Sequence, residues 1–295
     1  MSKAVSTQAL ALLTQRVFSL EEIQRQLEAG KFPCTIEETG GGDVLRGKLP
    51  HDGPDVVIEV VASAWPDKIE PEQDLGPFTR SGALERACKF NMNWTNAAEV
   101  AHQHQGVILV RMVQPEGAAS EKPTEVLAQL IAVAKVSRAI GTLPDVAGYF
   151  CPGGEIFVPI EVLDEILQAS KVAGFPPLDL FANLRLSWLD DRWIIFETMG
   201  NTQLGMRDFE VYADSKQHDL NDIAAWLRRW SWQHLTAENA LEDGTVTQGP
   251  GDASYDVLYA DDALLAPKRS VIRLIAQDEA KMPEGLPARL RIDRA

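Results

Sequence analysis

The side chains best suited to chemistry lie in one short segment, Thr198–Glu210 (TMGNTQLGMRDFE). The segment contains two glycines and mixes hydroxyl, amide, guanidinium and carboxylate groups, a composition typical of loops that line polar pockets. An alternative is a structural crossover between strands, in which glycine permits a positive φ. The candidate binding residues are Thr198, Asn201, Arg207, Asp208 and Glu210.

Two histidines, His102 and His104, are the next candidates, as metal ligands. Residues two apart on a helix point about 200° away from each other, so both cannot ligate one ion while the helix continues. Glu99 shares a helical face with His102, but a di-metal bundle needs a second carboxylate–histidine set, and the sequence has none. We therefore predict no metal site.

Nucleophilic and cofactor chemistry also lack their sequence signatures. A cysteine nucleophile needs a histidine base, and no local motif joins Cys88 or Cys151 to one. The chain has no G-x-S-x-G and no G-x-G-x-x-G, and Gly40–Gly42 lacks the lysine of a phosphate loop. We expect no catalytic residues and no cofactor. The chain has three cysteines, Cys34, Cys88 and Cys151, which are far apart in the sequence. This number and spacing indicate reduced thiols in a cytosolic protein.

The net charge of −15 is unevenly distributed. Residues 1–144 carry −4, residues 145–262 carry −14 and residues 263–295 carry +3. This balance argues against nucleic acid and anionic membranes as partners, and it permits a basic protein partner. Alternatively, the acids only maintain solubility. The candidate acidic surface consists of aspartates expected at turns: Asp190, Asp191, Asp214, Asp261 and Asp262.

Neither a membrane span nor a signal peptide is expected. No apolar stretch approaches the roughly 20 residues needed to cross a bilayer. The apolar run Ala9–Leu13 is too short for a secretory signal, and Arg16 follows it. The expected location is the cytoplasm.

Apolar periodicity and capping residues predict the elements that position these side chains. Ser19 and Glu22 form a capping box at the start of the first helix, which ends at Gly30. Further helices are expected at 81–90, 97–104, 124–140, 160–172 and 220–235. Strands are expected at 55–64, 107–113, 146–150, 155–158, 184–189, 193–198, 209–212 and 270–276.

This order of elements predicts an α+β fold of two similar-sized halves, with mixed or antiparallel sheets and helices packed on them. The expected organisation is an N-terminal helix and extension (1–50), a first α/β half (51–144), a second α+β half (145–280) and a flexible tail (281–295). Trp226 and Trp230 share a helical face and are expected in the core, whereas Trp232 is expected to be exposed.

Four stretches of the chain resemble a family of bacterial proteins known only as the domain of unknown function number 4261. They are DVVIEVVASAWP (55–66), NWTNAAEVAHQHQGVILVRMV (93–113), AGYFCPGGEIFVPIEVL (147–163) and LFANLRLSWLDDRWIIFETMGNTQLGMRDFEVYA (180–213). The resemblance covers most of residues 50–275, and this chain differs in a cysteine and a longer N-terminal arm. The family has no established activity. Its occurrence in bacteria with secretion systems implies an accessory or immunity role.

Two functions of different class follow. The first is a non-catalytic binding protein, of adaptor or immunity type, that acts through an acidic surface. The alternative is an enzyme or small-molecule sensor with a polar pocket at Thr198–Glu210. The two differ in one observable: a pocket requires this segment to line an enclosed polar cavity, whereas a structural crossover requires its polar groups to be satisfied within the fold.

Overall fold

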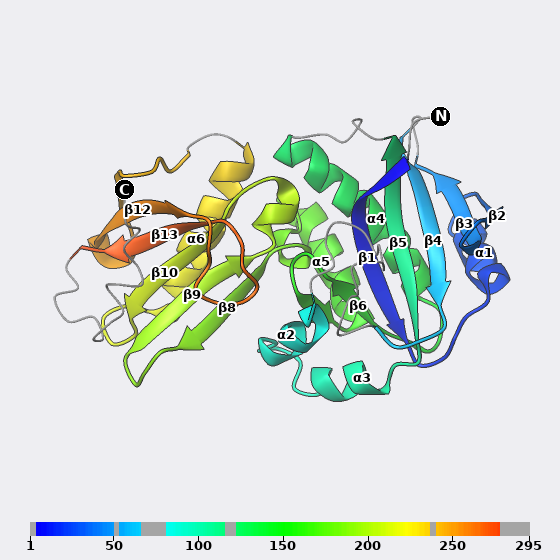
Figure 1. Ribbon diagram of the computed structural model, residues 1–295, viewed down its shortest axis with the longest axis horizontal. Helices are drawn as coiled ribbons and strands as arrows, with labels where there is room; N and C mark the ends of the chain where they lie inside the picture. Colours follow the sequence, from blue (N-terminus) through cyan, green and yellow to red (C-terminus); the bar gives the residue numbers. More distant parts are fainter. Residues whose placement is uncertain (1–3, 50–52, 66–80, 116–121, 237–239, 278–295) are drawn as a thin grey trace. The chain divides into compact units, whose positions relative to one another are not determined.

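The computed structural model describes residues 4–49, 53–65, 81–115, 122–236 and 240–277. The chain divides into two compact units, Met1–Ala182 and Asn183–Ala295 (Figure 1). Each unit has its own sheet and its own hydrophobic core. The predicted α+β class is confirmed, with two separate sheets and a larger first unit. The predicted tail, 281–295, lies outside the described residues.

The first unit is built on an antiparallel sheet, seven-stranded in the described residues, with the order β2-β3-β4-β5-β1-β6-β7. Its strands are β1 (Ala4–Thr14), β2 (Cys34–Thr39), β3 (Gly42–Lys48), β4 (Asp55–Val61), β5 (Gly106–Pro115), β6 (Val146–Cys151) and β7 (Ile156–Val158). Residues 39–42 form the turn of the β2–β3 hairpin, as their glycines predict. The strands β1, β2 and β3 were not predicted.

Strand β1 corrects the prediction of an N-terminal extension. It lies in the middle of the sheet, between β5 and β6, and every residue from Gln8 to Thr14 is buried. Leu10 and Leu12 face one side, while Ala11 and Leu13 pack in the cluster on the other side. Because both faces are covered, the strand is a continuous apolar run without alternation, and its sequence does not distinguish it from other short apolar runs.

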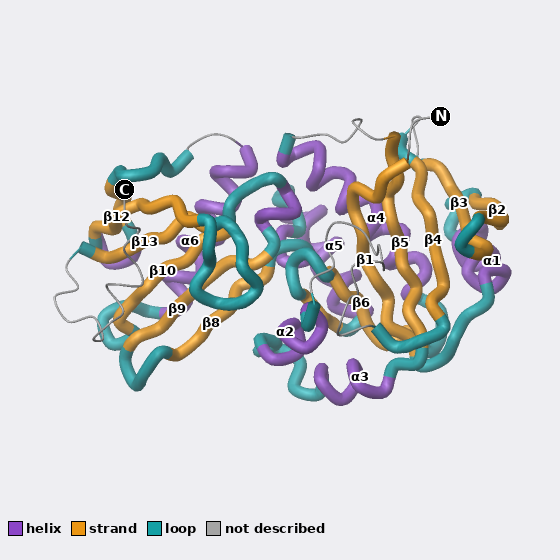
Figure 2. Tube along the Cα trace, viewed as in Figure 1, coloured by secondary structure: helices purple, strands orange, loops and turns teal. Residues whose placement is uncertain are grey.

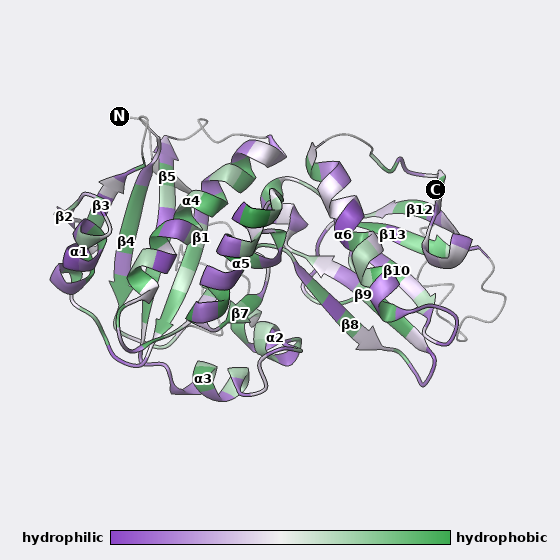
Figure 3. Cartoon of the chain, turned by 180° about the vertical axis from the view of Figure 1, so that it is seen from behind, coloured by the Kyte–Doolittle hydropathy of each residue, from purple (hydrophilic) through white to green (hydrophobic). Residues whose placement is uncertain are grey.

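Five helices belong to the described part of the first unit: α1 (Leu20–Ala29), α2 (Ala83–Lys89), α3 (Ala97–Gln103), α4 (Pro123–Gly141) and α5 (Ile160–Ala173). Helices α4 and α5 lie in front of the sheet in the reverse view (Figure 3). Helices α2 and α3 contribute Leu84, Ala87 and Ala97 to the cluster on the opposite face. The predicted capping box is present at α1, where Glu22 N–H donates to Ser19 Oγ at 3.3 Å.

The second unit is built on a mixed sheet, six-stranded in the described residues, with the order β11-β12-β13-β10-β9-β8. Its strands are β8 (Asn183–Trp188), β9 (Trp193–Met199), β10 (Asp208–Asp214), β11 (Val246–Gln248), β12 (Ser254–Ala260) and β13 (Val271–Ala276). Strands β10 and β13 run parallel, and the other neighbours are antiparallel. The predicted β8–β9 hairpin is confirmed, whereas β11 and β12 were not predicted.

Helix α6 (Leu220–Thr236) covers one face of this sheet (Figure 3). Trp226 and Leu227 pack there against Phe209, Val211 and Tyr255 of the strands. Trp226 is buried as predicted, Trp230 is partly buried against the same cluster, and Trp232 is half-buried instead of exposed. Short 3-10 turns span Leu178–Leu180, Asn201–Leu204 and Pro250–Asp252.

The boundary between the units falls between Ala182 and Asn183, not near residue 145 as predicted. The β6–β7 hairpin, assigned to the second half from its sequence, instead pairs with β1 in the first sheet. A hairpin is a local signal, but the sheet that it joins depends on a partner strand more than 130 positions earlier in the chain.

Candidate functional site

The predicted polar segment lies within a row of charged side chains that crosses four strands of the second sheet. Strand register places Arg185 of β8 opposite Glu197 of β9, Glu197 opposite Glu210 of β10, and Glu210 opposite Arg273 of β13. Residues paired in this way project from the same face of a sheet. All four side chains are buried, so the sheet carries an Arg-Glu-Glu-Arg row in its interior.

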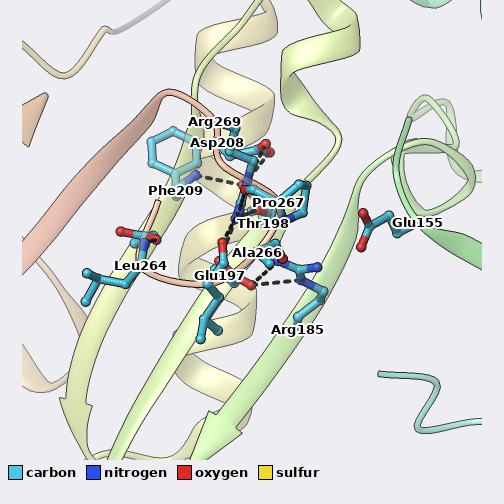
Figure 4. A network of polar contacts seen from close by, with 12 residues as sticks. Glu155, Arg185, Glu197, Thr198, Asp208, Phe209, Leu264, Ala266, Pro267 and Arg269 are labelled. Carbon is cyan, nitrogen blue, oxygen red and sulfur yellow. Dashed lines mark hydrogen bonds and ion pairs between the residues drawn. The ribbon is translucent and has the colours of Figure 1, made fainter. Parts of the chain in front are cut away.

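Glu197 is held between two guanidinium groups (Figure 4). Arg185 Nε donates to Glu197 Oε1 at 2.8 Å, and Arg185 Nη2 donates to the same oxygen. Arg269 Nη2 donates to Glu197 Oε2 at 2.5 Å. Arg269 also reaches β10, where its Nε donates to Asp208 Oδ2 at 3.1 Å. The two arginines therefore tie β8, β9 and β10 to the loop that precedes β13.

Residues 261–270, which join β12 to β13, form a strap over this row (Figure 2). The carbonyl of Ala266 accepts from Arg185 Nη2, and those of Leu265 and Pro267 accept from Arg269 Nη1, each at 3.1 Å. Leu264 and Leu265 pack on Ile195 and Tyr212 of the sheet. The strap thus supplies both carbonyl acceptors for the arginines and an apolar cover for the strands.

Glu210 and Arg273 hold the strap at a second point. Arg273 Nε donates to Glu210 Oε2 at 3.0 Å, and Arg273 Nη2 donates to the carbonyl of Asp262 at 2.7 Å. The other oxygen of Glu210 accepts from the backbone N–H of Leu264 at 2.7 Å. A buried carboxylate needs such donors, because loss of water otherwise costs several kcal/mol per ion.

The buried charges balance, with three arginines facing the three carboxylates of Glu197, Asp208 and Glu210. Burial raises the pKa of Glu197, although Arg269 and Arg185 act in the opposite direction. For Arg269, burial lowers the pKa, but Glu197 and Asp208 outweigh it and the net direction is upward. The set is a closed ion network, to which we refer below as the buried ion network: Arg185, Glu197, Asp208, Glu210, Arg269 and Arg273.

Thr198, Asn201 and Asp208 are brought together as a second part of the predicted site. Thr198 Oγ1 donates to Asp208 Oδ1 at 3.1 Å and accepts from the N–H of Phe209 at 2.8 Å. The N–H of Asn201 donates to Asp208 Oδ1 at 2.9 Å, and its Nδ2 donates to Ser231 Oγ at 3.0 Å. These bonds close the β9–β10 connection against helix α6.

The connection itself depends on glycine. Gly200 has φ 125° and Gly205 has φ 76°, and both values lie in the region that side chains rarely adopt. They flank the 3-10 turn Asn201–Leu204, which is buried except for Thr202, which is half-buried. Among the described residues of Thr198–Glu210, Asn201 Oδ1 is the one buried side-chain oxygen or nitrogen without a partner. The segment is therefore a packed crossover.

Arg207 does not join the other predicted binding residues. It is half-buried, and its Nη1 donates to the carbonyl of Ala260 at 3.0 Å and to Asp261 Oδ1 at 3.1 Å. Its guanidinium also lies over the ring of Tyr259, 4.8 Å from the centroid. Sequence reasoning missed four members of the buried ion network: Arg185, Glu197, Arg269 and Arg273. Of these, Glu197 and Arg273 were detectable as lone charges in the apolar strands WIIFETM and VIRLIA.

The prediction that Asp214 belongs to an exposed acidic surface is wrong. Asp214 is 1% exposed, and Arg192 Nε donates to its Oδ2 at 2.5 Å. This hydrogen bond from Arg192 lowers the pKa of Asp214, with a further contribution from the N–H of Lys216. A carboxylate engaged in this way at the end of β10 stabilises the fold and is not available to a partner.

The other four aspartates are exposed, but they divide between the two ends of the sheet. Asp190 and Asp191 lie in the turn that joins β8 to β9, whereas Asp261 and Asp262 lie in the strap that leads into the start of β13. Because β10 and β13 are parallel and β9 is antiparallel to β10, these turns are at opposite ends. These aspartates therefore do not form one acidic surface.

The turn that joins β8 to β9 carries an exposed aromatic residue beside its acids; the two strands are labelled in Figure 1. Trp188 is 55% exposed and Leu189 is 37% exposed. The turn is held by Asp190 Oδ1, which accepts from the N–H of Arg192 at 2.8 Å and of Trp193 at 2.7 Å. We refer to Trp188, Leu189, Asp190 and Asp191 as the hairpin tip, which is partly apolar and acidic.

His102 and His104 do not form a metal pair. The Nε2 atom of His104 accepts from the backbone N–H of Trp65 at 2.6 Å, and its Nδ1 donates to the carbonyl of Ala101. Both ring nitrogens are thus occupied. Cys34, Cys88 and Cys151, all within the described residues, are not in disulfides, as predicted. No helix in the described part of the chain has the length and apolarity to cross a membrane.

Comparisons with protein-family models, with curated proteins and with solved structures found no match for this chain. The resemblance to the family known as domain of unknown function number 4261 stays a prediction.

Proposed function

We propose that this chain is a cytoplasmic, non-catalytic binding protein, of adaptor or immunity type, which contacts a basic protein partner through the hairpin tip. The observation that carries the proposal is the exposed pair Trp188 and Leu189 next to two exposed aspartates on a turn held by its own hydrogen bonds. Tryptophan is among the residues most enriched at the energetic centres of protein interfaces.

The charge of the tip supports a basic partner. Asp190 and Asp191 are exposed, and the neighbouring Arg192 is engaged by Asp214, so it does not neutralise them. Acidic groups at the rim of an interface accelerate association with a basic surface, while an apolar centre supplies most of the affinity. Trp188 and Leu189 can form this apolar centre.

The polar segment Thr198–Glu210 supports binding over catalysis. Thr198, Asp208 and Glu210 are buried and hydrogen-bonded to groups of the same unit. An enzyme or sensor with its pocket there needs polar groups that face a ligand, and these groups face the buried ion network instead.

The proposal is tested by capture from a bacterial lysate with three versions of the full chain. The first is the wild type, the second carries Asp191→Lys, which leaves Asp190 to hold the turn, and the third carries Asp262→Lys. The third is a matched control, because it makes the same charge change in an exposed acid at the other end of the same sheet. A Trp188→Ala variant tests the apolar part.

We expect a basic protein that binds the wild type and the control but is lost from the Asp191→Lys variant and weakened at least about tenfold by Trp188→Ala, a cost of roughly 1.4 kcal/mol. Urea unfolding of each variant confirms that the fold is kept. Equal capture by all four versions would show that the hairpin tip is not the contact.

A further inference from the structure

A histidine in the last turn of helix α6 holds the chain that follows the helix. The Nε2 atom of His234 accepts a hydrogen bond from the backbone N–H of Leu241, seven positions later, at 3.0 Å. The carbonyl of Leu241 accepts from the hydroxyl of Tyr259 at 2.5 Å. The side chain of Leu241 is buried in the hydrophobic cluster between α6 and the second sheet. Both backbone groups of this core residue are therefore held by side chains.

The imidazole ring of His234 is fixed by two aromatic neighbours. It lies edge-on to Phe209 of β10, with the ring centroids 5.2 Å apart, and it packs against Trp230, one turn earlier in α6, at 6.2 Å. Because Nε2 accepts a hydrogen bond, the neutral ring carries its proton on Nδ1. A protonated imidazole has an N–H on both nitrogens and accepts no hydrogen bond, so protonation of His234 removes the acceptor of the Leu241 N–H.

The surroundings of His234 disfavour its charged form. Burial lowers its pKa below the ordinary value of 6.5, and no charged group contributes to the shift. Strand β10 offers it no carboxylate, because Asp208 and Glu210 pair with arginines of the buried ion network. The titratable groups of β12 in this cluster are the phenols of Tyr255 and Tyr259, a group that does not ionise in mild acid.

The remaining charged side chains near His234 in the sequence point largely to solvent. Among the described residues they are the half-buried Arg228 and the exposed Arg229, Glu242 and Asp243. Glu238 lies outside the described residues. The other histidine of this unit, His218, precedes the first turn of α6, at the opposite end of the helix. Within the described residues, His234 is therefore the group at this contact whose charge changes in mild acid.

We propose that His234 is an acid-sensitive latch, which holds Leu241 on the core of the second unit while the ring is neutral and releases it when Nε2 takes up a proton. The ring and the Leu241 N–H then face each other as two donors. The next bonds along the segment involve no histidine: Gly244 N–H donates to the carbonyl of Val257 at 2.8 Å, and Tyr259 N–H donates to Asp243 Oδ1 at 2.9 Å. Opening is therefore local to Leu241, and it exposes an apolar side chain.

The direction of the pH dependence follows from the lowered pKa. The unfolded chain takes up a proton at His234 near the ordinary value of 6.5, before the folded protein does. The stability contributed by the latch is therefore fully present above that value and falls as the pH decreases toward the lower, folded-state pKa. The latch is closed at neutral pH and opens in mild acid.

The test is NMR spectroscopy of the full, ¹⁵N-labelled chain, which has five histidines. His234→Gln assigns the ring of His234 and puts in its place an amide oxygen that accepts hydrogen bonds and does not titrate. His102→Gln makes the same change at an exposed histidine of the first unit, as a matched control. Hydrogen exchange of the Leu241 amide, corrected for its intrinsic pH dependence, reports the opening. The Gly244 amide, in the same segment, is the internal control.

Two results are expected. At about pH 8, the ring nitrogen shifts of His234 in the wild type should report a proton on Nδ1 and none on Nε2. Between about pH 7.5 and about pH 5, the corrected exchange rate of the Leu241 amide should rise about tenfold or more in the wild type and in His102→Gln. It should change less than about twofold in His234→Gln, and the Gly244 amide should change less than about twofold in every version.

Several results would overturn the proposal. One is a proton on Nε2 of His234 at about pH 8, a measurement that needs only the wild type and so does not depend on the folding of a variant. Another is a Leu241 amide whose exchange stays constant in acid. An equal rise in His234→Gln would assign the titration to a different group. An equal rise at Gly244 would show that the whole segment opens without a latch at His234.

Discussion

At the scale of single residues, Arg269 is the side chain on which most of the second unit's buried polar groups depend. A guanidinium has five N–H donors in a fixed fork. Arg269 uses them for Glu197, Asp208 and the carbonyls of Thr198, Leu265 and Pro267. Lysine has three donors at one point and cannot reproduce this geometry.

Replacement of Arg269 by Met should destabilise the protein by about 3–5 kcal/mol, because Glu197 and Asp208 would be left buried with one partner fewer. The free energy of unfolding in urea measures this. The matched control is Arg207→Met, which breaks a pair with an 84% exposed carboxylate, that of Asp261, and should cost less than about 1 kcal/mol. Equal costs for the two variants would contradict the assignment of Arg269 as the centre of the buried ion network.

At the scale of elements, the capping box of helix α1 also makes a contact outside the helix, with Arg16. Glu22 completes the capping box by accepting from the N–H of Ser19 at 3.0 Å. The same carboxylate also accepts from Arg16, at 3.0 Å from Nη2 and 3.2 Å from Nη1. The pKa of Glu22 is lowered to about 2. The largest cause is the hydrogen bond from Arg16, and the next is the hydrogen bond from the N–H of Ser19.

The stability contributed by Glu22 should therefore depend on pH. A depressed pKa in the folded state favours the ionised carboxylate, so the contribution is fully present above the ordinary value of 4.5 and is lost as the pH falls toward 2. The difference in urea midpoint between wild type and Glu22→Gln should be largest above pH 5 and shrink between pH 4.5 and 2. In an Arg16→Gln background, most of this pH dependence should disappear, and a difference that persists there would mean that Arg16 is not its main cause.

At the scale of the whole molecule, folding buries some of the acids of residues 145–262 and pairs them with arginines from other parts of the chain. Five acids of residues 145–262 are buried: Glu155, Glu197, Asp208, Glu210 and Asp214. Three of them belong to the buried ion network, where Arg269 and Arg273 come from the basic C-terminal segment. The −14 of the middle segment is therefore only partly a surface charge, and the exposed pairs Asp190–Asp191 and Asp261–Asp262 lie at opposite ends of the second sheet.

If the hairpin tip contacts a basic partner, only local steering by Asp190 and Asp191 should remain. The association rate of the captured partner should fall as salt is raised from 0.1 to 1 M, because the Debye length decreases from about 10 to about 3 Å. The Asp191→Lys variant should show a weaker salt dependence than the wild type, measured by stopped-flow. A salt dependence that is identical in the two versions would place the relevant charges elsewhere.

Most of the elements and the fold class could be predicted from the amino-acid sequence, because they depend on residues that are close together in the chain. The capping box at Ser19, the glycines of residues 40–42 and the hairpin at Asp190 act within a few residues. The predicted helices and the β8–β9 and β6–β7 hairpins follow from such signals. The lone charges Glu197 and Arg273 within apolar strands were visible in the sequence, but they were not predicted as part of a buried ion network.

Which elements pair with one another could not be predicted from local sequence signals. The central place of β1, the membership of β6 and β7 in the first sheet and the boundary after Ala182 depend on pairings between distant strands. The same is true of the site: the carboxylates of Asp208 and Glu210 are paired with Arg269 and Arg273, which lie 61 and 63 positions further along the chain. Such long-range pairs form only when both partners are buried together, because a charged side chain buried without its partner strongly destabilises the fold.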